Sequence, residues 1–240
     1  MSDPLFVFVH GGQHTKACWN PTLEVMVQHQ PNVQLLPVNL PGHGDEPGDL
    51  ASLSIRQCVD SVVANIEALK PEKIVLVGHS MAGITLPGVV ERLGAERVQH
   101  VVFVACCIPP QGKAVVDTLH MPMSYVARRE ARKNPVAKPI PKWLASWVFI
   151  NGGNQEEKQL TYDCLCDEST AVTIEPVDRS NFPRVPMTWV LPLKDRAVKP
   201  KLQRQFIENL GGVDKVVEID TCHNAMVTEP ELLAEVLLKL

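Results

Sequence analysis

The sequence of 240 residues lacks a long apolar run, and neither sign of charge dominates it. The longest apolar stretch, residues 101–110, is much shorter than the roughly 20 residues that a membrane-spanning helix needs. The N-terminus has neither a basic segment nor a small-residue cleavage site, so we expect no signal peptide and a cytoplasmic location. The formal net charge of −4 argues against a nucleic-acid partner and against a membrane partner, because nucleic acids and anionic membranes attract basic surfaces.

Common cofactor and metal motifs are missing as well. We find no phosphate-binding loop, no Gly-x-Gly-x-x-Gly between a strand and a helix, and no spacing typical of metal ligands. We therefore expect neither a cofactor nor a metal. The seven cysteines include no Cys-x-x-Cys pair, which is typical of free, mostly buried thiols in a reducing compartment. A redox or metal role for Cys164 and Cys166 is the alternative, but no second pair supports it.

Short apolar runs alternate with amphipathic helical segments along the chain. Strands that are apolar throughout indicate a parallel sheet covered on both faces, so the pattern predicts the α/β fold class. The predicted strands are residues 5–9, 33–38, 73–77, 100–105, 186–191 and 215–219. Ser54 with Gln57, and Thr228 with Glu231, are predicted to form capping boxes at the starts of two helices.

One long stretch breaks this alternation. Between Cys107 and Pro186 there is no clear buried strand, and helical pieces are predicted around residues 143–149 and 155–166. Segments of this length inside a compact domain usually serve a function, so we predict a small helical cap inserted after the fourth strand. We call residues 108–185 the cap segment, and residues 1–107 and 186–240 form the predicted core.

The third predicted strand leads directly into Gly78-His79-Ser80-Met81-Ala82-Gly83, and a helical run follows. Strand, Gly-x-Ser-x-small turn and helix is the context of a nucleophile elbow. The turn is strained, so the residues two before and two after the serine must be small. The sequence therefore predicts Ser80 as a nucleophile, and a tight turn with an idle serine is the alternative. Pro87 predicts a bend or irregular first turns in the following helix.

The remaining parts of a serine hydrolase site follow from chain order. The amide after the nucleophile, Met81, and an amide of the loop after the first strand, Gly12, are the predicted oxyanion donors. An acid and then a histidine should follow the serine along the chain. His223 comes after the last predicted strand, and Asp195 is the first carboxylate after the strand before it.

We therefore predict Ser80, Asp195 and His223 as a catalytic triad, in which Asp195 orients His223 and His223 takes the serine proton. Asp220 and Asp117 are rival acids. A helix N-cap is the alternative role for Asp195.

These motifs resemble those of plant methyl-esterases and hydroxynitrile lyases and of bacterial pyrethroid-hydrolase-like esterases. The resemblance rests on Val9-His10-Gly11-Gly12 with Trp19 beyond it, the serine elbow, Lys194-Asp195-Arg196-Ala197 and His223-Asn224-Ala225-Met226. It implies the α/β-hydrolase fold with about six strands and a small cap, hydrolysis of carboxylic esters without a cofactor, and a chain that can pair as a homodimer. The resembling lyases carry a lysine after the histidine, where this chain has Asn224, and this departure speaks against cyanohydrin cleavage.

The predicted substrate pocket draws on the first loop, the cap segment and the residue after the histidine. The side chains expected to line it are Gln13, His14, Trp19, Met121, Trp143, Trp147, Phe149 and Asn224. Their apolar members indicate small to medium hydrophobic esters, unless they only pack the cap onto the core. Lactones or thioesters, lyase or carbon–carbon bond cleavage, and a ligand receptor with slow turnover are the alternative functions.

Overall fold

A computed structural model describes residues 3–240. The N-terminal stretch for which we expect no signal peptide begins at residue 1, so its first two residues lie outside the described residues. Six parallel strands form one sheet in the order β2-β1-β3-β4-β7-β8. Their bounds are β1 Leu5–Val9, β2 Gln34–Val38, β3 Ile74–His79, β4 Val98–Val104, β7 Met187–Pro192 and β8 Lys215–Ile219. The predicted six-stranded sheet is confirmed, with ends that differ by one or two residues.

Burial along the strands follows their place in the sheet. Every residue of β1, β3 and β7 is buried, because each strand has neighbours on both sides and helices over both faces. The edge strands β2 and β8 are partly exposed, since each pairs on one side only. The uniformly apolar runs of the sequence therefore mark the centre of the sheet.

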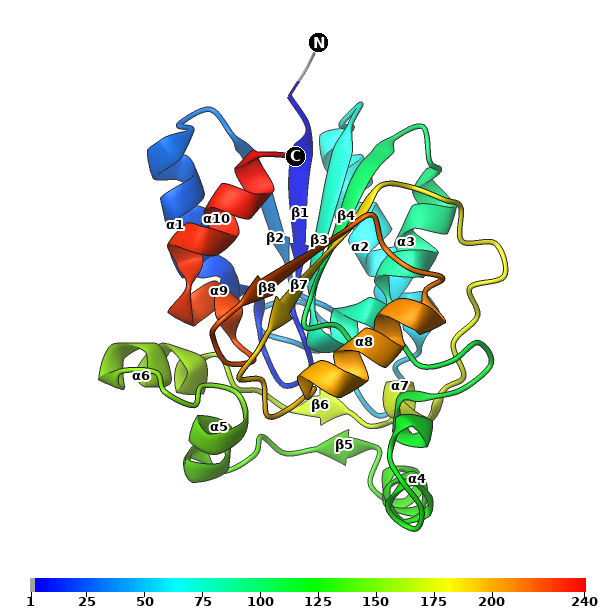
Figure 1. Ribbon diagram of the computed structural model, residues 1–240. Coiled ribbons are helices and arrows are strands. Elements are labelled where there is room, and N and C mark those ends of the chain that lie inside the picture. The colour runs from blue at the N-terminus through cyan, green and yellow to red at the C-terminus, as the bar shows by residue number, and fades with distance from the viewer. Residues whose placement is uncertain (1–2) are drawn as a thin grey trace.

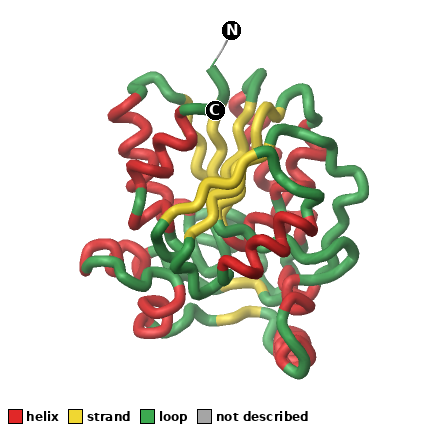
Figure 2. Tube along the Cα trace, viewed as in Figure 1, coloured by secondary structure: helices red, strands yellow, loops and turns green. Residues whose placement is uncertain are grey.

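Helices cover both faces of the sheet (Figures 1 and 2). One face carries α1 Asn20–His29, α9 Ala225–Thr228 and α10 Pro230–Leu238, and the other carries α2 Ile55–Leu69, α3 Leu86–Leu93 and α8 Pro200–Asn209. Successive residues of β1 divide between two apolar cores: Phe8 packs with Met26 of α1, and Val7 with Val62 of α2. No helix within residues 3–240 is long and apolar enough to span a bilayer.

Of the two predicted capping boxes, one is confirmed and one is wrong. Ser54 accepts from the Gln57 amide, and the Gln57 side chain accepts from the Ser54 amide, at the start of α2. Thr228 instead ends the short helix α9, and its hydroxyl bonds to that of Thr221. Because Pro230 already occupies the first position of α10, the helix begins after Glu229 without a side-chain cap.

The chain between β4 and β7 runs beneath the carboxyl ends of the strands (Figure 1). It contains 3-10 helix η3 Val115–Thr118, helices α4 Met123–Lys133, α5 Lys142–Val148, α6 Gln155–Asp163 and α7 Ala171–Ile174, and the short antiparallel pair β5 Val136–Ala137 and β6 Glu168–Ser169. The helices expected near residues 143–149 and 155–166 are confirmed as α5 and α6. This placement leaves loops after β1, β3, β7 and β8 facing the cap segment.

Candidate active site

The turn after β3 has the strain that the elbow motif predicts. Ser80 has φ of +52°, a left-handed conformation that residues with a side chain rarely adopt. A Cβ added to Gly78 would lie 2.6 Å from Leu86 Cδ1 and 3.0 Å from Ala82 Cβ, so this position admits only glycine. The chain continues as 3-10 helix η2, Ser80–Ile84, and α3 begins only at Leu86. The irregular first turns predicted from Pro87 are therefore confirmed.

The loops after β7 and β8 bring Asp195 and His223 together. Asp195 Oδ2 lies 2.7 Å from His223 Nδ1, and the two side chains are 0% and 1% exposed. The Ala197 and Val198 amides donate to Asp195 Oδ1, and Gln203 Nε2 donates to Oδ2. A buried carboxylate that accepts several N–H groups is stabilised in its charged form. It can therefore hold a proton on Nδ1 and leave Nε2 free.

Gln203 is a site residue that sequence reasoning missed. Trp189 Nε1 donates to its Oε1 at 3.0 Å, which fixes the orientation of the amide and turns its Nε2 toward Asp195. A single glutamine inside α8 carries no motif, so only the tertiary packing reveals it. The two rival acids are engaged elsewhere: Asp220 pairs with Lys194 on the surface, and Asp117 pairs with Arg128.

Aromatic contacts hold the His223 ring next to the elbow. The Phe149 ring stacks on it at 5.6 Å between centroids, and the His79 ring lies 4.5 Å away. His79 Nε2 donates to the His223 carbonyl, and burial keeps the pKa of His79 well below its usual value. Within residues 3–240 no hydrogen bond joins Ser80 Oγ to His223; in structures without substrate such bonds are often long.

The glycine loop after β1 lies against the elbow. A Cβ added to Gly11 would lie 2.7 Å from Ser80 Cβ, and one added to Gly12 would lie 2.6 Å from Met81 Sδ. The Gly12 N–H has no acceptor in the part of the chain that the structure describes. Met81 is the second residue of η2, where an N–H has no partner within the helix. Both predicted oxyanion amides are thus available beside Ser80.

Two neutral histidines orient the peptide groups of this loop. His10 Nδ1 donates to Gly11 O while its Nε2 accepts from the Leu40 amide. His14 Nδ1 donates to Gly12 O while its Nε2 accepts from Asn224 Nδ2. Burial lowers the pKa of His10 to about 3 and that of His14 to about 4, so both rings are uncharged near neutral pH. By fixing a carbonyl, each ring also fixes the N–H of the same peptide group. This is the Gly12 N–H for His10 and the Gln13 N–H for His14.

The residues predicted to line the pocket divide into four groups. His14, Phe149 and Asn224 lie beside His223 or the glycine loop. Trp19 is instead fully buried in the core against Phe8, with ring centroids 5.2 Å apart. The Gln13 side chain bridges the loop to the cap segment, where it bonds to Lys138 O and to the Ile140 amide.

The fourth group, exposed side chains of the cap segment, corrects that prediction. Met121, Trp143 and Trp147 are 73%, 72% and 56% exposed, so they point to solvent and do not form an apolar wall around Ser80. Helix α5 instead buries Ala145, and Trp147 lies under the Arg196 guanidinium. A short helix with apolar residues on several faces does not reveal from its sequence which face is covered.

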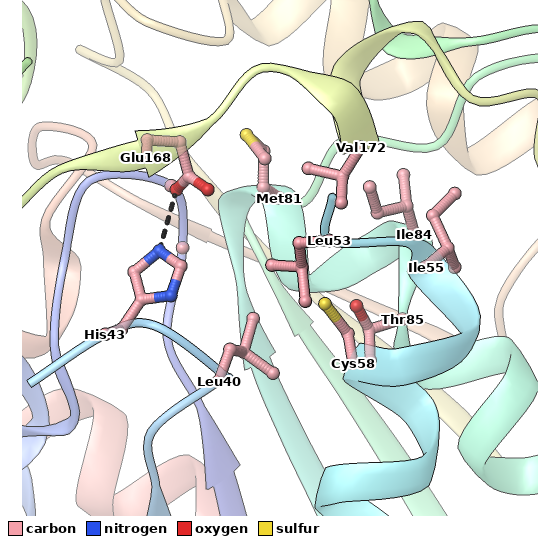
Figure 3. A pocket seen from close by; sticks show the side chains of 12 residues that line it. Leu40, His43, Leu53, Ile55, Cys58, Met81, Ile84, Thr85, Glu168 and Val172 are labelled. Carbon is pink, nitrogen blue, oxygen red and sulfur yellow. Dashed lines mark hydrogen bonds and ion pairs between the residues drawn. The ribbon is translucent and has the colours of Figure 1, made fainter. Parts of the chain in front are cut away.

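Gly12 and Met81 also line a small cavity, whose other side chains are shown in Figure 3. Its volume is about 20 Å³, which is room for a group the size of a water molecule. Most of its lining is apolar, and His43, Glu168 and Thr85 provide the polar part (Figure 3). The apolar side chains are Leu40, Leu53, Ile55, Met81, Ile84 and Val172. Sequence reasoning missed this cavity because its walls come from five separate segments.

The polar part of the cavity is a buried ion pair. His43 Nε2 lies 3.2 Å from Glu168 Oε2, and the side chains are 1% and 9% exposed. Burial lowers the pKa of His43, but the hydrogen bond and the charge of Glu168 together outweigh burial and raise it above its usual value. In the sequence His43 lies in a Pro-Gly-His-Gly turn, and Glu168 belongs to no motif. Neither residue carries a sequence signal for the pair.

Comparison with known proteins supports the resemblance seen in the motifs. A model of the alpha/beta hydrolase family matches residues 6–236. The probable esterase PIR7A of Oryza sativa subsp. indica is 27% identical over 98% of this chain and 95% of its own length. Methylesterase 18 of Arabidopsis thaliana is 24% identical over 100% of this chain and 97% of its own.

Solved structures share the fold over nearly the whole chain. An extracellular alpha/beta-hydrolase from a Paenibacillus species has a TM-score of 0.84 at 22% identity, covering 99% of this chain and 98% of its own. The pyrethroid hydrolase PytH has a TM-score of 0.79 at 17% identity, covering 99% of this chain and 97% of its own.

Proposed function

Because the chain belongs to the α/β-hydrolase family, we propose that it hydrolyses carboxylic esters, with Ser80 as nucleophile, His223 as base and Asp195 as the acid that orients the base. The observation that carries this proposal is the strained Ser80 turn beside a buried His223–Asp195 pair. Relatives named as esterases, among them PIR7A and methylesterase 18, support ester hydrolysis over other reactions of the family.

The first half of the reaction forms an acyl-enzyme. Ser80 Oγ attacks the ester carbonyl carbon while His223 Nε2 takes the hydroxyl proton. The carbonyl oxygen becomes an oxyanion, which the Gly12 and Met81 amides stabilise. The tetrahedral intermediate collapses as the carbon–oxygen bond to the alcohol breaks, and His223 returns its proton to that alcohol. Asp195 remains ionised throughout and keeps the other imidazole proton on Nδ1.

The second half releases the acid. A water molecule attacks the acyl carbonyl while His223 takes one of its protons, and the same two amides stabilise the second oxyanion. Collapse breaks the bond to Ser80 Oγ, which regains its proton from His223, and the carboxylic acid leaves. The two steps consume only the ester and one water molecule, and they need no oxidant, reductant or further reactant.

The cavity beside Gly12 and Met81 indicates which esters fit best. Because its lining is mostly apolar and its volume of about 20 Å³ is room for one water-sized group, we propose that it receives the methyl group of an acetyl ester. Longer acyl chains require Leu53, Val172 or their neighbours to move. Within the class of small to medium hydrophobic esters, short acyl esters are therefore the proposed substrates.

The other reactions on this fold are less well supported. Asn224 stands where a lyase would carry lysine, and its side chain is engaged by His14 and Thr161. Not every relative is named as an esterase: two others are named norfluorocurarine synthase 2 and salicylic acid-binding protein 2. Lactones and thioesters would use the same residues as esters. The homodimer, the cytoplasmic location and the expectation of no nucleic-acid, membrane or cofactor partner stay predictions.

Covalent labelling tests the proposed nucleophile directly. We expect phenylmethylsulfonyl fluoride to add one sulfonyl group per chain, and peptide mass spectrometry to locate it on Ser80. Ser180→Ala, at an exposed loop position, is the matched control and should label like the wild type. Labelling that persists in Ser80→Ala, or that falls on another residue, would overturn the proposal.

A further inference from the structure

Glu168 reaches from the cap segment to the back of the glycine loop. Its Oε2 accepts the Gln13 amide at 2.7 Å and the His43 imidazole at 3.2 Å, and its Oε1 accepts the Ser169 amide at 2.8 Å. The side chain is almost wholly buried. Figure 3 shows the carboxylate above His43 at the end of the cavity. One carboxylate therefore connects the cap segment, the glycine loop and the turn at His43.

The contact with Gln13 fixes a peptide group next to the predicted oxyanion donor. The Gly12–Gln13 peptide donates its N–H to Glu168 and accepts from His14 at its carbonyl, so it is held at both ends. Gln13 has φ of +59°, a conformation that persists for a residue with a side chain only where its surroundings impose it. The Cys166 amide also donates to Gln13 O. The Gly12 N–H belongs to the preceding peptide, whose carbonyl bonds to His10, so the docked cap segment restrains this N–H from the other side of Gly12.

A carboxylate at this place has an electrostatic consequence. A Cβ added to Gly12 would lie 3.3 Å from Glu168 Oε2, so the negative charge lies beside the amide that would bind the oxyanion. An unpaired carboxylate would repel a developing oxyanion, because the field of a buried charge is only weakly screened. The site therefore needs a compensating positive charge close to Glu168.

His43 has the geometry of a protonated imidazole. Both of its ring nitrogens face oxygen acceptors: Nδ1 faces Pro41 O at 3.1 Å, and Nε2 faces Glu168 Oε2. Each of the two neutral rings nearby, His10 and His14, has one nitrogen that accepts from an N–H donor. A ring with two acceptors needs a proton on both nitrogens.

The buried titratable groups around the pair are uncharged, and the nearby carboxylates Asp45 and Asp167 are already paired with Lys16 and Lys138. The His10 ring lies 4.9 Å from that of His43, and it is neutral near pH 7. Burial raises the pKa of the Cys58 and Cys166 thiols to about 12. The compensation of Glu168 therefore falls to His43.

We propose that Glu168 and His43 act together as positioning residues: Glu168 holds the Gly12–Gln13 peptide for oxyanion binding, and His43 cancels the charge that Glu168 brings to the site. This inference rests on the proposed function, because the pair acts through the Gly12 amide. It predicts that removing His43 alone is more harmful than replacing both residues by neutral amides.

The test is a double-mutant cycle on p-nitrophenyl acetate hydrolysis with His43→Gln, Glu168→Gln and the double variant. His43→Gln leaves the Glu168 carboxylate without a compensating charge beside the oxyanion. We expect a loss similar to that of an oxyanion donor, about 10²-fold in kcat, with little change in KM. The double variant should recover about tenfold of this loss, because neither partner is then charged. The rates are compared per folded chain, because a buried pair with a purely structural role would recover stability, but not the rate of the folded enzyme, on the second substitution.

Glu175→Gln is the matched control. Glu175 is also a carboxylate of the cap segment that accepts a core amide, that of Ile55, but it does not lie at Gly12. It should keep the wild-type kcat. Wild-type kcat in both His43→Gln and Glu168→Gln would overturn the proposal, and so would losses that simply add in the double variant.

A second measurement uses the wild-type protein and does not depend on the folding of any variant. Nitrogen-15 NMR of the imidazole groups should show His43 protonated on both nitrogens at pH 7, and a neutral His43 would overturn the proposal. Failure of the underlying function is distinguishable: Ser80→Ala would then retain esterase activity. An inactive Ser80→Ala beside fully active pair variants would refute this inference alone.

Discussion

Asp195 Oδ2 lies 2.7 Å from His223 Nδ1, and solvent reaches almost no part of either side chain. Three further N–H groups donate to the same carboxylate, from Ala197, Val198 and Gln203. The carboxylate is therefore fixed in direction, and it can hold the imidazole in one tautomer. This relationship is the basis of the first prediction.

Asp195→Asn should lower kcat by about 10³ to 10⁴-fold, because an amide no longer enforces a proton on His223 Nδ1. The measurement is steady-state hydrolysis of p-nitrophenyl acetate. Asp220→Asn is the control, since Asp220 pairs with Lys194 on the surface and should be dispensable for activity. Equal activity of the two variants would show that Asp195 has no part in catalysis.

Gly12→Ala should lower kcat by about 10²-fold while the fold is retained. The new methyl group would lie 2.6 Å from Met81 Sδ and 3.3 Å from Glu168 Oε2, so the loop must move and the Gly12 amide is displaced. Gly112→Ala is the control: Gly112 has φ of +72° with no atom within 4 Å of the added carbon, so it should lose some stability but no activity. Unchanged kcat in Gly12→Ala would argue against this oxyanion donor.

Leu53→Ala should shift the preferred acyl chain toward butyrate and hexanoate. Leu53 lines the cavity beside Met81, and removing its side chain enlarges that space. We expect a stability loss of about 2 to 5 kcal/mol from the buried leucine. Leu93→Ala, a buried leucine of α3 away from the cavity, should lose similar stability and keep the wild-type chain-length profile. Identical profiles would mean that the cavity does not receive the acyl chain.

Folding stability should fall as the pH is lowered from 6.5 to 5. The pKa values of His10 and His14 are lowered to about 3 and about 4 in the folded chain, so the unfolded chain takes up these protons first. Stability is then fully present above about pH 6.5 and falls by up to about 1.4 kcal/mol per pH unit for each histidine. His43 has a raised pKa and is protonated in both states at the lower end of this range, so it does not reverse the slope.

Urea unfolding at several pH values measures this slope. Because burial also keeps the pKa of His79 well below its usual value, three histidines contribute, and His14→Asn should reduce the slope by about a third. A free energy of unfolding that stays constant between pH 5 and 6.5 would contradict the assignment of these histidines as buried and neutral.

Features that depend on neighbouring residues were readable from the sequence. The buried strands, the Ser80 turn and the irregular start of α3 follow from apolar runs, small residues and Pro87. The Asp195–His223 contact followed from the chain order expected of the fold, because the carboxyl ends of parallel strands meet at one edge of the sheet. These local and topological rules do not require knowledge of side-chain packing.

Features that depend on distant packing were not readable. His43 and Glu168 are separated by 125 positions, and no spacing rule links them. The cavity near Gly12 combines segments from β1 to α7, so its size appears only when they are packed. Trp143 and Trp147 are apolar in sequence but exposed in the structure, because a short helix can present such residues to either side.

The most direct test of the account is the rate of p-nitrophenyl acetate hydrolysis by Ser80→Ala beside the wild type and Ser180→Ala. We predict measurable turnover by the wild type and by Ser180→Ala, and a loss of about 10³-fold or more in kcat for a folded Ser80→Ala. A Ser80→Ala variant that retains wild-type turnover would contradict the central claim that Ser80 is the nucleophile.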